Sequence, residues 1–405
     1  MRTALTYTTL SVFLLYSGVA LAQSQNKAPV PTPPPNVPSQ EPAFEGQTRA
    51  PQIDSNVTLD HTVVADGFEH PWAIEFMPDG RMLVTERAGR LRIVSPSGEV
   101  SDPVEGLPEI DSRGQGGLLD IVLGRNFAKD RKLYFSYAEP HENGETNTAV
   151  ARATLSEDGS TLNNVETIFR QQPSWASTKH YGSRLVWDNN GHLYVTLGER
   201  SLPEPRQLAQ QLDNHLGKVV RINPDGSAPD DNPFVGQENA KPEIWSYGHR
   251  NIQSAALNPS SGELWTVEHG PQGGDEINIP EAGKNYGWPV ITYGEDYSGE
   301  PIGEGITAKQ GMEQPIYYWD PVISPSGIAF YQGDMFSNWQ GNLLVSALNP
   351  SSLVRLELDG NRVSGEERLL TDIGRIRDVA EGPDGALWVI TDKDNGELIH
   401  VTRGD

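Results

Sequence analysis

The sequence predicts an all-β protein built as a six-bladed β-propeller. A short strand, a tight turn and a second strand of alternating apolar residues recur along the chain, and such a hairpin repeated at intervals of tens of residues is typical of a propeller. The 405 residues include 41 Gly and 31 Pro, and only 36% are hydrophobic. This composition suits a turn-rich β protein better than a helical one. A pair of stacked β-sheets is the alternative, but it explains the repeated turn less well.

The first 22 residues have the pattern of a secretory signal peptide. Arg2 precedes an apolar run from Leu5 to Ala22 that ends in Ala-Leu-Ala, and small residues at this point are typical of a cleavage site. An uncleaved anchor is the alternative. No pair of arginines precedes the run, so we expect Sec-type export and a periplasmic or secreted mature protein. The mature chain has no further apolar span long enough to cross a bilayer.

Residues 23–56 are rich in Pro, Gln and Ser and lack a periodic apolar pattern. Such a composition is typical of an extended, solvated linker. We therefore expect a disordered linker over residues 23–56 and a propeller domain over residues 57–405.

The repeated hairpin is clearest in four places and recognisable in two more. Its turns contain Asp-Gly or similar pairs that supply the positive φ of a tight hairpin, and its alternating strands bury one face. The four clear copies are AIEFMPDGRMLVTE from Ala73, RLVWDNNGHLYVTLGE from Arg184, SAALNPSSGELWTVEHG from Ser254 and DVAEGPDGALWVITD from Asp378. A fainter copy starts at Ile328, and GGLLDIVLGRNF with KLYFSYAEP forms the second blade.

These hairpins give about six blades between residue 58 and the C-terminus. The strand near residues 61–65 is expected to complete the last blade, which would close the ring and remove its free edges. The sequence contains no long amphipathic helix, and residues 204–212 are the best candidate for a short one.

Charge and cysteine content exclude several classes of function. The net charge is −24 and the pI is near 4.7, so the surface repels phosphate backbones and anionic lipids, which argues against nucleic-acid and membrane-surface partners. The chain has no Cys. Disulfides, thiolate catalysis, Fe–S clusters and a lipid-modified N-terminal cysteine are therefore excluded.

Propellers bind ligands at one mouth of the central channel, so the polar residues that stand out in each repeat belong together. They are Gln115, His180, Glu199, Arg250 with Asn251, Gly270 with Pro271, and Arg375 with Arg377. The densest stretch is 248–288, where a Gly/Pro turn runs into Asp275 and Glu276. Glycines let a backbone approach a ligand, and carboxylate and carbonyl oxygens bind hard divalent cations. A polar surface turn between two strands is the alternative interpretation of this stretch.

The motifs GQGGLLD, H-x-GSRL, SYGHRN-x-Q, EHGP-x-GGDEIN, KNYGWP and RIRDV occur in this order along the chain. With them, residues 60–403 resemble the soluble pyrroloquinoline quinone (PQQ)-dependent aldose sugar dehydrogenases of the glucose/sorbosone dehydrogenase group. The resemblance implies a six-bladed propeller with PQQ at the channel mouth. It also implies calcium-dependent oxidation of aldoses at the anomeric carbon to lactones, with electrons passed to an external acceptor.

The resemblance implies catalytic roles for three residues. His180 matches the general base that takes the proton of the anomeric hydroxyl, a task that suits imidazole near neutral pH. Glu199 matches its acidic partner, which is Asp in the glucose-oxidising relative. Arg250, together with Asn251, matches the pair that contacts the quinone oxygens, where a cation stabilises developing negative charge.

Further matches concern the cofactor and the metal. Gln115 matches a contact to substrate or cofactor, and Arg375 and Arg377 match the arginines that hold PQQ carboxylates as fork-shaped donors. The carbonyls of Gly270 and Pro271 match those that bind the catalytic calcium. The matches to structural calcium ligands are Glu276, Tyr286 through its carbonyl, and Asp296.

One position departs from the family pattern. Asn349 stands where the glucose-oxidising relative adds a lysine to the grip on PQQ, so we expect weaker PQQ binding, by about 1–3 kcal/mol for a desolvated contact. Two alternatives to the dehydrogenase stay open from the residues alone. One is a non-catalytic propeller that binds a sugar or a protein at its mouth, and the other is a calcium-dependent lactonase.

Overall fold

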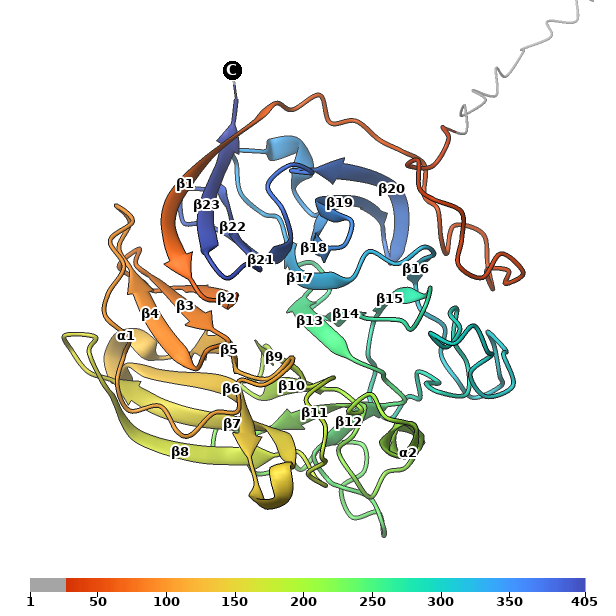
Figure 1. Cartoon of the computed structure of the whole chain (residues 1–405), viewed down its shortest axis with the longest axis horizontal. Coiled ribbons are helices and arrows are strands. Elements are labelled where there is room, and N and C mark those ends of the chain that lie inside the picture. The colour runs from red at the N-terminus through yellow and green to blue at the C-terminus, as the bar shows by residue number, and fades with distance from the viewer. Residues whose placement is uncertain (1–26, 405) are drawn as a thin grey trace, which may run out of the picture.

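The computed structural model describes residues 27–404, which form a ring of six β-sheets around a central channel (Figure 1). The all-β, six-bladed prediction is confirmed. The innermost strands β2, β5, β9, β13, β17 and β21 surround the channel, and each contacts its neighbours in the adjacent blades. The predicted signal peptide lies outside the described residues.

Each blade is an antiparallel sheet that runs outward from the channel. Blade 1 contains β2 (Pro71–Phe76), β3 (Met82–Glu86) and β4 (Arg90–Val94). Blade 2 contains β5 (Leu118–Leu123), β6 (Lys132–Pro140), β7 (Thr146–Leu155) and β8 (Leu162–Arg170). Blade 3 contains β9 (Gly182–Trp187), β10 (Leu193–Leu197), β11 (Lys218–Ile222) and β12 (Ile244–Tyr247).

The second half of the ring repeats this arrangement. Blade 4 contains β13 (Ile252–Leu257), β14 (Leu264–Glu268), β15 (Asp275–Asn278) and β16 (Tyr317–Trp319). Blade 5 contains β17 (Pro325–Phe330), β18 (Leu343–Leu348), β19 (Ser351–Asp359) and β20 (Arg362–Leu369). Blade 6 contains β21 (Ile376–Glu381), β22 (Leu387–Thr391), β23 (Gly396–Arg403) and, from the other end of the chain, β1 (Leu59–Phe68).

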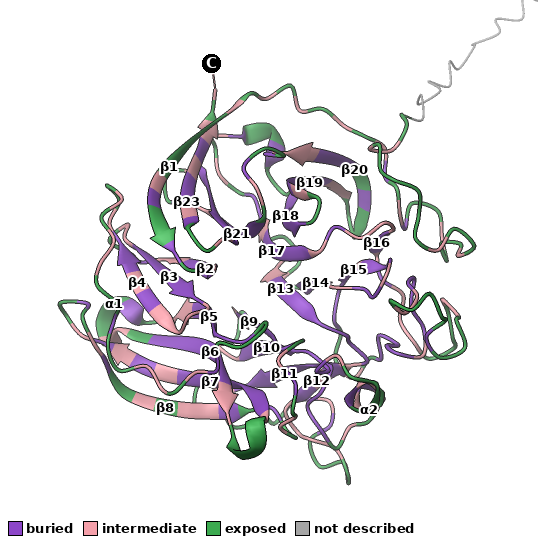
Figure 2. Cartoon of the chain, in the orientation of Figure 1, coloured by how far each residue is buried: buried purple, intermediate pink, exposed green. Residues whose placement is uncertain are grey.

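The repeated hairpins of the sequence are the two innermost strands of each blade. The second strands β3, β10, β14, β18 and β22 are buried along their whole length, because both of their faces pack against other blades (Figure 2). The predicted closure of the ring is also confirmed. Strand β1 pairs antiparallel with β23, with Leu59 opposite Arg403 and Val63 opposite Ile399.

Helices are few and short among residues 27–404. The predicted short helix corresponds to α2 (Pro203–Arg206), which continues into the 3₁₀ turn η2 (Gln207–Gln210). The other helical turns are α1 (Phe127–Asp130), η1 (Glu142–Gly144) and η3 (Ser337–Trp339). No described helix is long and apolar enough to span a membrane.

The prediction of a disordered, solvated linker is wrong for residues 27–56, which we call the N-terminal strap. The strap runs along the outer edge of blades 4 and 5 (Figure 1). Thr48 bridges Tyr318 and Gln52 bridges Glu366, both in parallel. The side chain of Gln47 is fully buried and donates to the carbonyl of Pro315 over 2.8 Å. Isolated bridges and single buried side chains hold the strap, and neither produces a periodic pattern in the sequence.

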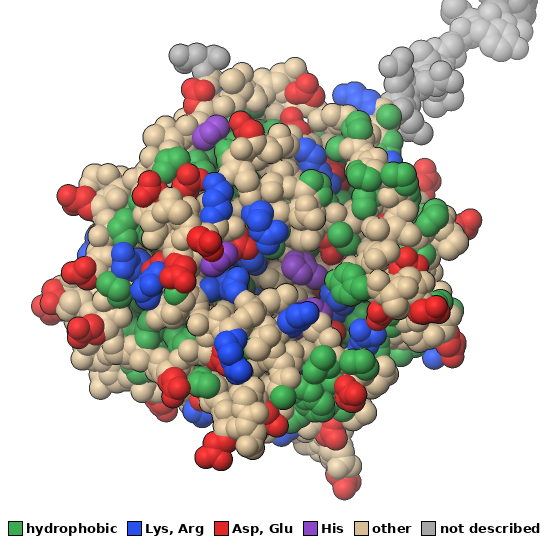
Figure 3. Space-filling view, viewed as in Figure 1, with side chains coloured by type: hydrophobic (Ala, Val, Ile, Leu, Met, Phe, Trp, Pro, Cys, Tyr) green, Lys and Arg blue, Asp and Glu red, His purple; other side chains and the backbone are tan. Residues whose placement is uncertain are grey.

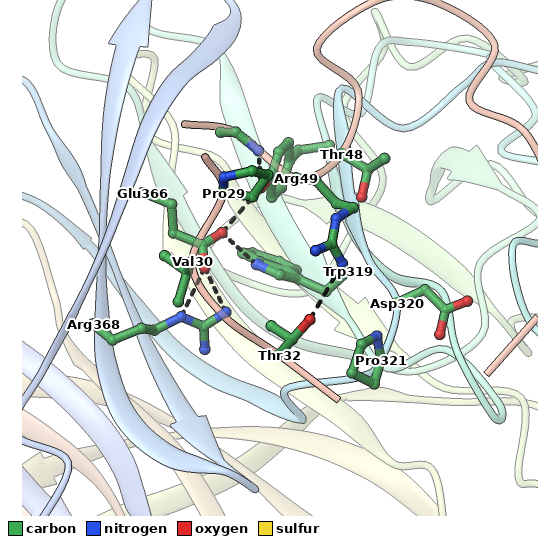
Figure 4. A pocket seen from close by; sticks show the side chains of 12 residues that line it. Pro29, Val30, Thr32, Thr48, Arg49, Trp319, Asp320, Pro321, Glu366 and Arg368 are labelled. Carbon is green, nitrogen blue, oxygen red and sulfur yellow. Dashed lines mark hydrogen bonds and ion pairs between the residues drawn. The ribbon is translucent and has the colours of Figure 1, made fainter. Parts of the chain in front are cut away.

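A pocket of about 300 Å³ lies between the strap and blades 4 and 5 (Figure 4). On its floor the carboxylate of Glu366 accepts hydrogen bonds from Trp319 Nε1 over 2.9 Å and from Arg368 Nε over 2.7 Å. The partners of Glu366 therefore join the outer strands of two neighbouring blades beneath the strap.

Inside the channel, four charged residues form a layer that we call the channel belt: Glu75, Asp120, Arg184 and Asp378. Arg184 donates to Asp120 Oδ1 over 3.0 Å and to Asp378 Oδ1 over 3.2 Å. The last three each occupy the third position of an innermost strand. The belt therefore links blades 2, 3 and 6 across the channel.

Candidate functional site

At one mouth of the channel, a cavity of about 680 Å³ is lined by residues from all six blades. We call it the mouth cavity. In each blade, the loop before the first strand and the loop after the second strand meet at the same end of the hairpin, which brings the six pairs of loops together. Figure 3 shows basic and His side chains gathered at the centre of this face and acidic side chains around its rim. The lining residues are Trp72, Arg87, Gln115, Leu119, Tyr181, Gly182, Gln253, His269, Ser324, Leu348, Arg375, Arg377 and Asp392.

His180 and Glu199 form a buried pair in blade 3, as the family resemblance implies. His180 Nδ1 lies 3.2 Å from Glu199 Oε2, and the imidazole residue is only 6% exposed. Gln115 Oε1 accepts the main-chain N–H of His180 over 2.8 Å, and Glu199 Oε2 also accepts the N–H of Ser201. The carboxylate fixes the tautomer with the proton on Nδ1. His180 Nε2 is therefore the nitrogen that can accept a proton.

The surroundings of this pair keep His180 neutral, so that it can accept a proton. Burial lowers the pKa of His180 below its usual value, and the charge of Arg250 adds to this effect, while the Glu199 carboxylate opposes it. Burial alone would raise the pKa of Glu199, but the interaction with His180, the charge of Arg250 and the hydrogen bonds to the carboxylate leave its pKa below the usual value. At neutral pH the imidazole is neutral and its partner is ionised.

Arg250 and Asn251 lie directly beside this pair, in the loop before β13. The carbonyl of Arg250 accepts the N–H of Glu199 over 3.0 Å, and Asn251 Oδ1 accepts the N–H of Gly182 over 3.2 Å. The guanidinium of Arg250 donates to the carbonyl of His269 over 2.9 Å, and its Nε is buried without a partner in the described residues. The structure therefore joins the predicted residues of blades 3 and 4 in one site.

Four of the five predicted metal ligands line a second, smaller pocket of about 260 Å³, to which Arg250 and His269 also contribute. They are Gly270, Pro271, Glu276 and Tyr286. Position 270 requires glycine, because a Cβ there would lie 2.2–2.3 Å from the carbonyl oxygens of two nearby glycines. Burial, and then the nearby charge of Glu268, raise the pKa of Glu276 well above its usual value. Carboxylates and the carbonyl oxygens of a glycine turn are the groups that bind a hard cation.

The fifth predicted ligand, Asp296, is not brought to this pocket. Its carboxylate lies 3.3 Å from Arg206 in α2, in a partly exposed ion pair. Within residues 27–404, no group of three or more His, Cys, Asp or Glu side chains is arranged to hold a metal. A metal in the smaller pocket would therefore depend on main-chain carbonyl oxygens.

Arg375 and Arg377 both reach the mouth cavity from blade 6. Their terminal nitrogens donate to Asp392 Oδ2 over 3.1 and 2.7 Å. Arg87 lines the same cavity from blade 1. Burial lowers the pKa of Arg87, and the positive charges of Arg377 and Arg375 lower it further. We call Arg87, Arg375 and Arg377 the arginine cluster.

The sequence patterns do not single out Arg87, His269 or Asp392, yet all three line the mouth cavity. Each directly follows the second strand of its blade, namely β3, β14 or β22. An alignment of the repeats at the residue after the second strand would have identified these three residues. The same position in blade 5 is Asn349, whose side chain is exposed.

A buried imidazole–carboxylate pair beside a cationic cavity at the mouth of a propeller has the features of an enzyme site. The family is identified by comparison. The model of the Glucose / Sorbosone dehydrogenase family matches residues 68–400. The chain belongs to this family, and the predicted family and dehydrogenase class are confirmed.

Individual relatives agree with this assignment. The chain is 46% identical over 350 residues to the aldose sugar dehydrogenase YliI of Escherichia coli, a match that covers 85% of the chain and 93% of the relative. The apo-form of the soluble aldose sugar dehydrogenase from Escherichia coli is 45% identical and superposes with a TM-score of 0.82, covering 86% and 100%. The PQQ-bound aldose sugar dehydrogenase of Streptomyces coelicolor is 26% identical, with a TM-score of 0.70 and coverages of 85% and 99%.

Proposed function

We propose that this protein is a PQQ- and calcium-dependent aldose sugar dehydrogenase. It oxidises aldoses at the anomeric carbon to lactones and passes the electrons to an external acceptor. The observation that carries the proposal is that the buried His180–Glu199 pair and Arg250 contact Gln115 and His269, which line the mouth cavity together with the arginine cluster. The PQQ-bound relative from Streptomyces coelicolor supports the choice of cofactor.

The residues present fit a quinone that carries several carboxylates. The Nε atoms of Arg250 and Arg377 are buried without a partner in the described residues. Arg375 and Arg377 share the single carboxylate of Asp392 and would hold cofactor carboxylates. Arg250 and Asn251 would hold the quinone oxygens, and Gln115 would form a further contact. PQQ, when bound, supplies the hydride acceptor, and calcium supplies the charge that polarises it.

His180 performs the proton transfer in this proposal. Its neutral Nε2 accepts the proton of the anomeric hydroxyl, so that the carbon–oxygen bond can become the carbonyl of the lactone. Glu199 holds the Nδ1–H through the 3.2 Å contact and stabilises the imidazolium that forms. Gln115 keeps His180 in place through its main-chain N–H.

The smaller pocket fits calcium through the carbonyl oxygens of Gly270 and Pro271. No main-chain N–H in the described residues donates to either oxygen, and Glu276 and Tyr286 line the same pocket. Free carbonyl oxygens and carboxylates are the ligands that calcium prefers. A lactonase would instead need metal-binding carboxylates at the mouth, and the part of the chain that the structure describes has no cluster of three or more.

The test is to load the purified protein with PQQ and calcium and to follow aldose-dependent reduction of an artificial dye. His180→Gln should lower the rate by about 10²- to 10⁴-fold, the usual contribution of a general base, with PQQ affinity retained. Binding of PQQ without turnover of any sugar in a broad panel would leave only a binding propeller. Equal loss of rate and PQQ affinity in His180→Gln would reassign that residue to cofactor binding.

We propose in addition that the protein works in the periplasm or outside the cell. The support is the signal-like sequence of residues 1–22. N-terminal sequencing of the exported protein should find Gln23 as the first residue. Retention of the full chain in the cytoplasm would contradict this proposal.

A further inference from the structure

Arg87 is held in the mouth cavity by the loop that carries Gln115. It directly follows β3 and is half-buried, and its Nε donates to the carbonyl of Gly116 over 3.3 Å. A second nitrogen of the same guanidinium donates to the carbonyl of Gly114. These two contacts fix the direction of the side chain. They involve neutral acceptors only, so they leave the positive charge of Arg87 uncompensated.

The arginine cluster contains more positive than negative charge. Its one carboxylate, Asp392, already accepts from Arg375 and Arg377 on Oδ2 and lies 2.7 Å from His70 on Oδ1. Arg87 forms no ion pair with any described carboxylate. An arginine does not lose its proton in a protein, so three guanidinium groups face one carboxylate. A bound anion would relieve the mutual repulsion of these groups.

This surplus is notable because the chain as a whole has a net charge of −24. Single-sign clusters in a cavity concentrate ligands of the opposite sign, and the planar fork of arginine matches a carboxylate with two hydrogen bonds. Three guanidinium groups around one cavity thus suit a small molecule with several carboxylates.

We propose that Arg87 binds a carboxylate of the cofactor, as a third cation beside Arg375 and Arg377. This inference rests on the proposed function and assigns a residue to the same site. Arg87 and Asn349 hold equivalent positions, directly after the second strands of blades 1 and 5. Blade 1 therefore supplies the positive charge that the neutral Asn349 does not provide.

The experiment is an equilibrium titration of the calcium-loaded protein with PQQ, read by protein fluorescence and without substrate. Arg87→Gln keeps hydrogen-bond donors for the two glycine carbonyls but removes the charge. It should raise the Kd for PQQ by about 10- to 100-fold, the cost of losing a charged hydrogen bond. Arg87→Lys should recover part of the affinity. The matched control is Arg113→Met in the same loop, because Arg113 is exposed and paired with Asp111, and its Kd should equal that of the wild type.

A second titration separates charge from structural support. The trimethyl ester of PQQ carries no carboxylate charge, so Arg87→Gln should bind this ester as well as the wild type does. If the variant lost affinity for PQQ and the ester equally, Arg87 would only support the Gln115 loop, and the proposal would be overturned. Raised salt should weaken PQQ binding to the wild type more than to Arg87→Gln; equal salt dependence would also count against it.

The outcomes separate this inference from the proposed function. A wild-type protein that binds no PQQ would overturn both. A wild-type protein that binds PQQ and an Arg87→Gln variant that binds it equally well would overturn only the role of Arg87. Thermal unfolding of each variant shows whether it is folded. If Arg87→Gln does not fold, the salt and ester titrations of the wild type and of Arg87→Lys still test the proposal: affinities independent of salt and of esterification would overturn it.

Discussion

Two charged clusters lie in the same channel, and their net charges have opposite signs. In the channel belt, three carboxylates (Glu75, Asp120 and Asp378) surround one arginine, Arg184. At the mouth, the three arginines of the arginine cluster surround one carboxylate, Asp392. Both clusters are formed by residues of several blades, and both carry a surplus of one sign.

The two surpluses are relieved in different ways, because a carboxylate can take up a proton and an arginine cannot lose one. Burial raises the pKa of Glu75 to about 7 and that of Asp120 to about 6, although Arg184 opposes both shifts. The belt can therefore neutralise itself within the fold. The arginine cluster cannot do so, and a bound anion would neutralise it. We therefore expect the belt to have a structural role and the mouth to be the binding site.

The largest expected effect concerns the arginine of the belt. Arg184→Met leaves Asp120 and Asp378 buried without their cation, which should lower the free energy of unfolding by about 3–5 kcal/mol. Urea unfolding measures this effect. The control is Arg152→Met, because Arg152 forms a partly exposed pair with Glu166 and should cost at most about 1 kcal/mol. If Arg184→Met kept the wild-type stability but bound PQQ more weakly, Arg184 would serve binding and not stability. The distinction between the two clusters would then be wrong.

Glu75 should make the stability of the belt depend on pH. Its pKa is about 7 in the folded state, against an ordinary value of 4.5, so the folded state binds this proton more tightly. Stability contributed by the protonated form is present below pH 4.5 and is lost as pH rises through 7. Glu75→Gln should therefore unfold with a free energy about 1–3 kcal/mol higher than the wild type at pH 8 and nearly equal at pH 4. Parallel stability–pH curves for the two proteins would contradict this.

At the mouth, pH should act on activity instead. His180 must be neutral to accept a proton, so kcat/KM should fall as pH drops through its lowered pKa. Glu199→Gln removes the charge that supports the imidazolium, so this acid limb should move to lower pH by about 1 unit, and kcat/KM should fall on the plateau. Rate–pH profiles of both proteins provide the measurement. A limb that moves to higher pH would show that Glu199 does not act through His180.

The smallest expected effect concerns Asp296, which lies outside the smaller pocket. Asp296→Asn removes only a partly exposed pair with Arg206, which contributes less than about 1 kcal/mol. The calcium affinity should therefore stay at the wild-type value, while Glu276→Gln, inside the pocket, should weaken it. Calcium titration of both variants is the measurement. Equal losses of calcium affinity in the two variants would show that Asp296 is a ligand.

Much of the architecture follows from local patterns. The inner hairpin of each blade contains its own turn and its own alternating strands, so the blades could be located before any contact between them was known. The family resemblance carried by the short motifs implied that His180 and Glu199 form a pair, and the structure finds the two side chains 3.2 Å apart. The N-terminal strap could not be predicted in this way, because Gln47 and the two bridged strap residues find their partners far along the chain.

By itself, the sequence determined the ring of blades, the family and the candidate residues of the site, since these depend on hairpins and on motifs that are each contiguous in the chain. Only the tertiary structure decided which charges remain without a partner. Arg87 is an ordinary arginine after a strand until blades 1 and 6 close the ring and place it beside Arg375 and Arg377. A surplus of charge is a property of the space that several blades enclose, and no single segment of the sequence contains it.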